Sequence, residues 1–459
     1  MYITLLFIVY TLPISILNKP YRDDYDRIIK NYLGWSDNGR PLADLVIDSL
    51  IAGGPIISFG VFSCIIASLI MALTCCIYCT YIRKDKSIKA LLPLIAFYSS
   101  PFFIQFLYYK LDSITILLSI AVLFAPFLIK DKNKGVLFNI SAMICAIISL
   151  SLYQASFPVF LALLAVRAQH DDFNLAKTIA SILSFFSGVV VYKVIISSYF
   201  ISGVYSEESS RLLSPLNKGF IGNYIDNVSK VWGVVKLINS YSVAASLLIA
   251  VLIVAFWLLK NFKKETHRSS KMILTISSAI GSAFLFFLQE RVTTEPRSLI
   301  YVSCIMLLFL ALVNTLYLSR LSTIICSVTI ICFVNIYLHV NYAREEQFRY
   351  EQSVMQMINN IADNNSDKKI FVYGWSAPKN VLSVYDTTPL SIKIANPDFG
   401  SWYFSQYLEF YNARKNIFRG GSSTFTIECK NLREKYNGFY TTENKGNNIS
   451  VYLRNIECI

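Results

Sequence analysis

The amino-acid sequence predicts a mostly α-helical polytopic membrane protein with a small C-terminal α/β domain. Three observations lead to this prediction. Only 15% of the 459 residues are charged, whereas a soluble domain normally has about 25%. The mean hydropathy is +0.49. Uncharged runs of about 17 to 25 residues, the length that crosses a bilayer as a helix, recur until about residue 340, after which the chain turns polar.

Each long apolar run is assigned to one membrane span, which gives about eleven spans. The first run, 1–17, lacks the basic start and small-residue cleavage site of a secretory signal, so we interpret it as a span. Its shortness leads us to expect that the natural start codon lies upstream. The spans are expected near 1–17, 56–82, 89–107, 112–129, 135–152, 154–168, 175–198, 241–259, 272–289, 298–317 and 321–340.

Dense basic clusters set the expected orientation. Arg83–Lys86, Lys130–Lys134 and Lys260–Lys271 all fall on one side of the predicted spans, and the positive-inside rule makes that side cytoplasmic. The N-terminus is then cytoplasmic, whereas the first loop, 18–55, and the chain from 341 onward face outward. We therefore expect a transmembrane domain over 1–340, with its chemistry in the first outer loop, and an extracytoplasmic domain over 341–459.

Short strand and helix patterns define the predicted C-terminal domain. Residues 369–373 form a β-branched and aromatic run that ends at a glycine, and 401–413 have apolar residues at helical spacing. Residues 439–453 are predicted to form two strands joined by the turn 444–447. Cys429 and Cys458 are the cysteines outside apolar runs, so an extracytoplasmic location would permit a disulfide between them.

A charge cluster after the first span contains the predicted catalytic base. In a helix, Asp23 with Arg27 and Asp26 with Lys30 have the spacing of ion pairs. Such a surface helix would by itself account for these charges. Asp24 is the carboxylate least committed to such a pair, and a carboxylate within hydrogen-bond reach can deprotonate an attacking hydroxyl. We predict Asp24 as the base and Asp23 as the next candidate.

Two further residues are predicted to contact a sugar or an acceptor. Trp35 is flanked by glycines that permit close approach of a ligand, and Asp112 lies in the turn before the fourth predicted span. The alternative for Trp35 is a tryptophan at the lipid headgroups. Neither interpretation is decided by the sequence.

Cations from separate outer loops are predicted to bind a phosphate group. Arginine grips phosphate through two parallel bonds, and lysine binds it as a point charge. Each of these side chains has the alternative of extending to the membrane interface. The candidates are Arg27, Arg40, Lys110, Arg291 and Arg297.

The motifs that are absent narrow the function. The sequence contains no H-E-x-x-H, no Walker A motif and no G-x-G-x-x-G, which argues against a zinc protease, a nucleotide-driven pump and a dinucleotide enzyme. We expect no metal and no cofactor. The formal net charge of +13 comes from basic residues between apolar runs, so it indicates lipid headgroups and not nucleic acid.

Several of these motifs together resemble the bacterial Gtr-type O-antigen glucosyltransferases. The motifs are Tyr21–Arg27, Gly34-Trp35, Gly39–Leu42, Lys110–Ser113 and Tyr153–Ser156. The resemblance extends over most of the membrane part and is weaker in the C-terminal domain. It implies a GT-C type membrane glycosyltransferase that converts serotype by adding a sugar, commonly glucose, to lipopolysaccharide O-antigen.

The resemblance also implies the donor, the partners and the location. The donor would be a polyprenyl-phosphate sugar such as undecaprenyl-phosphate-glucose. The base would be Asp24 or Asp23, with Arg27 and Arg40 beside it, and transfer would invert the anomeric centre. A small flippase and a donor-synthesising glucosyltransferase would act with the protein at the bacterial inner membrane. The alternatives are a translocase or a polymerase of lipid-linked polysaccharide.

Overall fold

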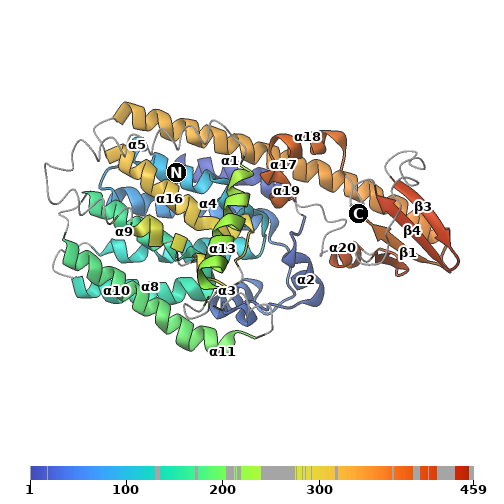
Figure 1. Ribbon diagram of the computed structural model, residues 1–459, viewed down its shortest axis with the longest axis horizontal. Helices are drawn as coiled ribbons and strands as arrows, with labels where there is room; N and C mark the ends of the chain where they lie inside the picture. The colour runs from blue at the N-terminus through green and yellow to red at the C-terminus, as the bar shows by residue number, and fades with distance from the viewer. Residues whose placement is uncertain are drawn as a thin grey trace. The chain divides into compact units, whose positions relative to one another are not determined.

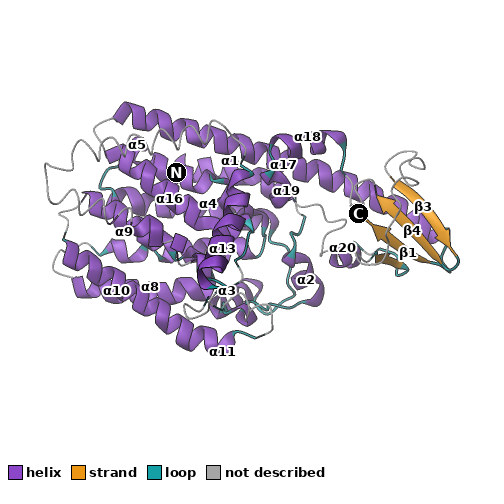
Figure 2. Cartoon of the chain, viewed as in Figure 1, coloured by secondary structure: helices purple, strands orange, loops and turns teal. Residues whose placement is uncertain are grey.

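The computed structural model is mostly helical (Figures 1 and 2) and divides into two compact units. The first unit consists of Met1–Lys19 and Leu33–Tyr337, and the second of Pro20–Tyr32 and Leu338–Ile459. The structure describes residues 2–129 apart from 18, 135–170, 174–202, 219–238, 292–315, 319–374, 377–395, 404–420 apart from 412, 440–453, and parts of 211–213 and 274–290.

The first unit is a bundle of apolar helices. Its α-helices of eight or more residues are α1 (Tyr2–Ile16), α3 (Pro41–Ile51), α4 (Gly60–Ile77), α5 (Ile88–Ser99), α6 (Pro101–Tyr108), α7 (Asp112–Val122), α8 (Gly135–Leu152), α9 (Pro158–His170), α10 (Leu175–Val191), α13 (Phe220–Lys236) and α16 (Ile300–Thr315). Short helical segments join them: η1 (Ser36–Asn38), η2 (Tyr78–Ile82), η3 (Ala125–Leu128), η4 (Gln154–Ser156), η5 (Tyr192–Ser197), α11 (Ser198–Phe200) and η6 (Pro296–Leu299).

The predicted number of membrane spans is supported in part. Within the described residues, five helices are long and apolar enough to cross a membrane, or six if the bent pair α5 and α6 is one span. Helices α1 and α7 are apolar but shorter. The predicted span 241–259 and parts of 272–289 lie outside the described residues.

Two of the predicted spans are interrupted at prolines. The run 89–107 bends by 60° between α5 and α6, where Pro101 begins the second helix and Ser100 is extended with ψ 138°. A proline disfavours α-helical geometry for the residue before it. The run 112–129 is α-helical only to Val122 and ends in the 3₁₀ segment η3, which contains Pro126.

Close packing of α8 against α10 shows how the bundle is held together; the two helices lie side by side in Figure 1. A Cβ added at Gly188 of α10 would lie 2.8 Å from the Cβ of Ala146 and closer still to the Met143 carbonyl oxygen. Phe185 of α10 also stacks on Phe160 of α9, with ring centroids 4.3 Å apart. Small residues at such contacts let helix backbones approach, which is the usual source of helix association in membranes.

The last predicted span continues far beyond its expected end. Helix α17 covers Ser319–Asp363 without a break, 45 residues in all. At 1.5 Å per residue it is about 68 Å long, roughly twice the 30 Å hydrocarbon core of a bilayer. The change from apolar to polar composition near residue 341 therefore falls inside α17. A helix can have an apolar half and a polar half, so this change does not mark the end of a helix.

The second unit contains the small sheet that the sequence predicts. Strand β1 (Lys369–Tyr373) matches the expected strand, and β3 (Tyr440–Lys445) and β4 (Asn448–Leu453) form the expected hairpin, with Gly446 at φ 59° in its turn. The sheet order is β2-β1-β4-β3, with β1 parallel to β4 and to β2 (Ile417–Arg419). Its other helices are α2 (Asp23–Lys30), α18 (Lys379–Thr387), α19 (Leu390–Ala395) and α20 (Phe404–Phe410), the last within the predicted helix 401–413.

Candidate functional site

The predicted catalytic segment forms α2, whose carboxylates differ in burial. Asp26 pairs with Lys30 at 2.7 Å on the exposed side, as the i,i+4 spacing predicted. Asp24 is fully buried, Asp23 is half-buried and Arg27 is buried. Asp24 therefore differs from Asp23 and Asp26 in its burial, whereas the sequence distinguished it by helical spacing alone.

An aromatic cluster in the second unit holds α2. The ring of Tyr25 is fully buried and lies edge-to-face on Tyr407, Phe410 and Tyr411, with centroid distances of 6.0, 5.3 and 6.4 Å. A helix of eight residues is too short to be stable by itself in water. The position of Asp24 thus depends on the packing of its neighbour against α20 and the residue after it.

A second set of contacts holds the two residues directly before α2. The Tyr21 hydroxyl donates to the Ile394 carbonyl at 2.7 Å, and an Arg22 Nη2 group donates to the Lys393 carbonyl at 2.9 Å. The Arg344 guanidinium lies 4.6 Å from the centroid of the Tyr21 ring. Arg344 was not predicted from the sequence, where the only indication is that this arginine follows soon after the last apolar run.

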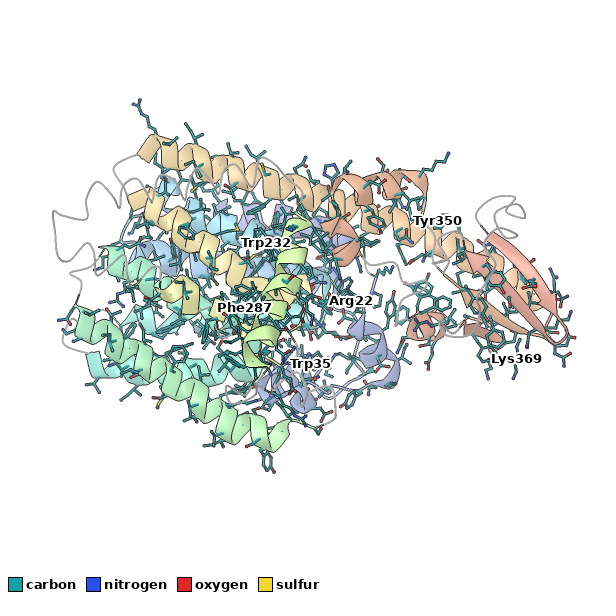
Figure 3. All side chains as sticks on the ribbon, in the orientation of Figure 1. Arg22, Trp35, Trp232, Phe287, Tyr350 and Lys369 are labelled. Atoms are coloured by element: carbon teal, nitrogen blue, oxygen red, sulfur yellow. The ribbon has the colours of Figure 1, made fainter. Side chains whose placement is uncertain are left out.

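A buried polar cluster in the first unit brings together three of the predicted site residues. The indole N–H of Trp35 (labelled in Figure 3) donates to Asp112 Oδ1, and Asp112 Oδ2 lies 3.5 Å from Arg297 Nη1. Arg297 also lies over the Tyr109 ring at 4.0 Å. Trp35 and Asp112 are both buried. In this conformation Trp35 orients Asp112, and its proposed contact with a sugar stays a prediction.

The turn that carries Trp35 is fastened by an aspartate that was not predicted. The backbone N–H of Trp35 donates to Asp44 Oδ1 at 2.9 Å, and that of Ser36 donates to Asp44 Oδ2 at 2.7 Å. Asp44 lies in the first turn of α3. A carboxylate that accepts two backbone bonds fixes a turn firmly, because charge-assisted bonds are the stronger ones.

Tyr153 joins Arg40 and Arg297. The Arg40 guanidinium lies 4.8 Å from the centroid of the Tyr153 ring, and the Tyr153 hydroxyl donates to the Arg297 carbonyl at 3.3 Å. Burial raises the pKa of the Tyr153 phenol, although Arg297 and Arg40 act to lower it. The phenol therefore keeps its proton and remains a donor. Two of the five predicted phosphate ligands thus share one aromatic neighbour.

A glutamine inside an apolar helix supports the Arg297 segment. Gln105 of α6 is buried, accepts from the Arg297 backbone N–H at 2.8 Å and donates to Glu295 Oε2 at 3.1 Å. Sequence reasoning missed both Gln105 and Glu295. The available signal was one amide side chain in an otherwise apolar run, since a buried amide requires partners.

Lys110 has a structural partner. Its ammonium donates to the Ile14 carbonyl at 2.6 Å, and its side chain is buried. Carbonyls in the last turn of a helix have no partner within the helix, and a cation there also interacts well with the helix dipole. Lys110 therefore stabilises the end of α1, and its role toward phosphate stays a prediction.

Three predicted residues, Arg291, Cys429 and Cys458, lie outside the described residues. In the part of the chain that is described, no three His, Cys, Asp or Glu side chains gather in a way that would hold a metal ion. Metal independence remains an expectation from the chemistry of the donor.

Apolar helices long enough to cross a bilayer, with a buried cluster of arginine, carboxylate and aromatic side chains, define a membrane protein with an internal polar site. Residues 12–319 match the family described as Glucosyl transferase GtrII, and the chain belongs to this family. The predicted resemblance to Gtr-type glucosyltransferases is thereby confirmed.

One curated relative comes from Salmonella phage P22, the "Uncharacterized 55.3 kDa protein in gtrB 5'region". It is 30% identical over 230 residues, which is 48% of this chain and 47% of the relative. The chain thus spans about half the length of that relative. No solved structure matches.

Proposed function

We propose that the protein is an inverting membrane glucosyltransferase. It would move a sugar, glucose, from a polyprenyl-phosphate carrier such as undecaprenyl-phosphate-glucose to O-antigen or another lipid-linked surface polysaccharide. The reaction would take place on the periplasmic side of the bacterial inner membrane. Membership of the glucosyl transferase family supports this proposal, and so do the apolar helices, which suit a donor dissolved in lipid.

The burial of Asp24 is the observation that carries the mechanism. Of the three carboxylates on α2, Asp24 is the one that is fully buried, whereas Asp26 is ion-paired on the surface. In the proposed step Asp24 takes the proton of an acceptor hydroxyl. The hydroxyl oxygen bonds to the anomeric carbon, the bond from that carbon to the phosphate oxygen breaks, and the electron pair leaves with the polyprenyl phosphate.

Cations would stabilise the negative charge that develops on the leaving phosphate. Arg40 and Arg297 are the strongest candidates, because the Arg40 guanidinium lies over the Tyr153 ring and the Arg297 guanidinium lies over the Tyr109 ring and faces Asp112. Preorganised charges act more strongly at a developing charge than mobile ones do. The carrier has a single phosphate, so the proposal needs no bridging metal. Arg27, Lys110 and Arg291 remain candidates from the sequence.

The proposal is tested with purified protein in detergent, undecaprenyl-phosphate-glucose and an acceptor polysaccharide. Asp24→Asn is expected to lower kcat by about 10²- to 10⁴-fold, the usual contribution of a general base. Asp26→Asn is the matched control and should transfer at nearly the wild-type rate. Asp23→Asn distinguishes the two candidate bases. Wild-type turnover in Asp24→Asn would remove Asp24 from the mechanism.

The same assay separates the alternative functions. A transferase releases polyprenyl phosphate in step with sugar transfer and inverts the anomeric configuration. A translocase would release none, and a polymerase would require a diphosphate-linked donor. Linkage analysis of O-antigen from cells with and without the protein gives the acceptor residue. In such cells a small flippase and a donor-synthesising glucosyltransferase would have to supply the donor.

A further inference from the structure

A single glutamine bonds to both ends of the turn that precedes α3. Gln154 is the first residue of η4. Its Nε2 group donates to the Asn38 carbonyl at 2.6 Å, and its Oε1 atom accepts from Arg40 Nε at 2.9 Å. The carbonyl acceptor on one side and the guanidinium donor on the other leave one orientation for the amide.

Tyr192 completes this contact at the middle residue of the turn. Its hydroxyl accepts from Gln154 Nε2 at 2.9 Å and donates to the Gly39 carbonyl at 2.8 Å. Tyr192 begins η5, a π-helical turn that follows α10; such turns are frequent at functional sites. Three consecutive residues, 38 to 40, are thus held by two side chains that are distant in sequence.

Gly39 allows this close approach. It has φ 74°, which strains any other L-residue. A Cβ at this position would lie 2.9 Å from Tyr192 Oη and 3.2 Å from Gln154 Nε2. The turn therefore needs a glycine both for its backbone conformation and for its contact with the two side chains.

These contacts determine the orientation of Arg40, which is half-buried. Its Nε group is bonded to Gln154, and its guanidinium plane is held over the Tyr153 ring at 4.8 Å. Together these contacts fix the direction in which the two Nη groups point. A guanidinium held in this way loses less conformational entropy on binding a phosphate.

We propose that Gln154 is a positioning residue that, together with Tyr192, orients Arg40 toward the phosphate of the lipid-linked donor. This inference rests on the proposed function, in which Arg40 binds that phosphate. It assigns a role to Gln154, which belongs to the Tyr153–Ser156 motif. Gln154 would act through Arg40 and would not touch the donor.

A double-mutant cycle tests the proposal, with KM for undecaprenyl-phosphate-glucose and kcat measured for every variant. Gln154→Leu is expected to raise the donor KM roughly tenfold, the effect of losing a hydrogen bond to a charged group. Arg40→Ala should raise it at least as much. In the double variant the two effects should not multiply, because Gln154 acts through Arg40. Gln352→Leu, an exposed glutamine on α17, is the control.

The possible results distinguish failure of the phosphate role of Arg40 from failure of the positioning role of Gln154. If Arg40→Ala leaves the donor KM unchanged, the phosphate role of Arg40 fails. If Arg40→Ala raises the KM but Gln154→Leu does not, or if the two effects multiply in the double variant, the positioning role is overturned. Should Gln154→Leu not fold, Tyr192→Phe decides: it keeps the ring and is expected to raise the donor KM several-fold only when Arg40 is present.

Discussion

Replacing Tyr25 by alanine tests whether the second unit holds the proposed catalytic helix. Tyr25 lies directly after Asp24, is fully buried, and makes three edge-to-face ring contacts with centroids 5.3 to 6.4 Å away. Removing a large buried aromatic side chain costs about 3 to 5 kcal/mol. Each aromatic pair supplies about 0.5 to 1.5 kcal/mol beyond area burial, so the three pairs account for much of that loss.

We expect kcat to fall together with the free energy of unfolding. The eight residues of α2 cannot hold a helix alone, so loss of the Tyr25 contacts releases Asp24 from its position. A displacement of about 1 Å of a catalytic group can cost about 100-fold in rate. Tyr25→Ala should therefore lower kcat about 100-fold and reduce the unfolding temperature of the protein in detergent.

The assay compares kcat, donor KM and thermal unfolding for three variants. Tyr25→Phe keeps the ring contacts and should retain most of the wild-type kcat, which rules out a role of the hydroxyl in the chemistry. Tyr32→Ala is the matched control, because this tyrosine follows α2 and is 47% exposed. Wild-type kcat and unfolding temperature in Tyr25→Ala would refute the inference that α20 holds α2.

Two further predictions concern the first unit. Asp112→Asn removes the charge facing Arg297 at 3.5 Å, so the arginine should lose its fixed direction; we expect a several-fold higher donor KM in steady-state assays, and an unchanged KM would exclude Asp112 from the site. Gly188→Ala places a methyl group against the backbone of α8 and should destabilise the bundle by about 1 to 3 kcal/mol in unfolding experiments. Gly233→Ala is its control, because a Cβ there meets nothing within 4 Å; equal loss in both variants would contradict the packing.

Local patterns determined several parts of this protein. Apolar runs predicted membrane helices, and i,i+4 spacing predicted the Asp26–Lys30 pair. A β-branched and aromatic run that ends at a glycine predicted β1, and the turn signal at 444–447 predicted the β3–β4 hairpin. All of these depend on residues within a few positions of one another, where backbone geometry dictates which side chains meet. The family resemblance was also visible in short motifs and is confirmed.

The tertiary structure alone decided which distant residues meet. Trp35 and Asp112 are 77 positions apart, and Arg40 and Gln154 are 114 apart. Tyr25 packs on α20 near the other end of the chain. No periodicity encodes such pairs, because they arise from the packing of whole helices. The sequence by itself therefore identified Asp24, Arg40 and Arg297 as candidates, whereas only the fold showed that Tyr25, Tyr153 and Gln154 hold them in place.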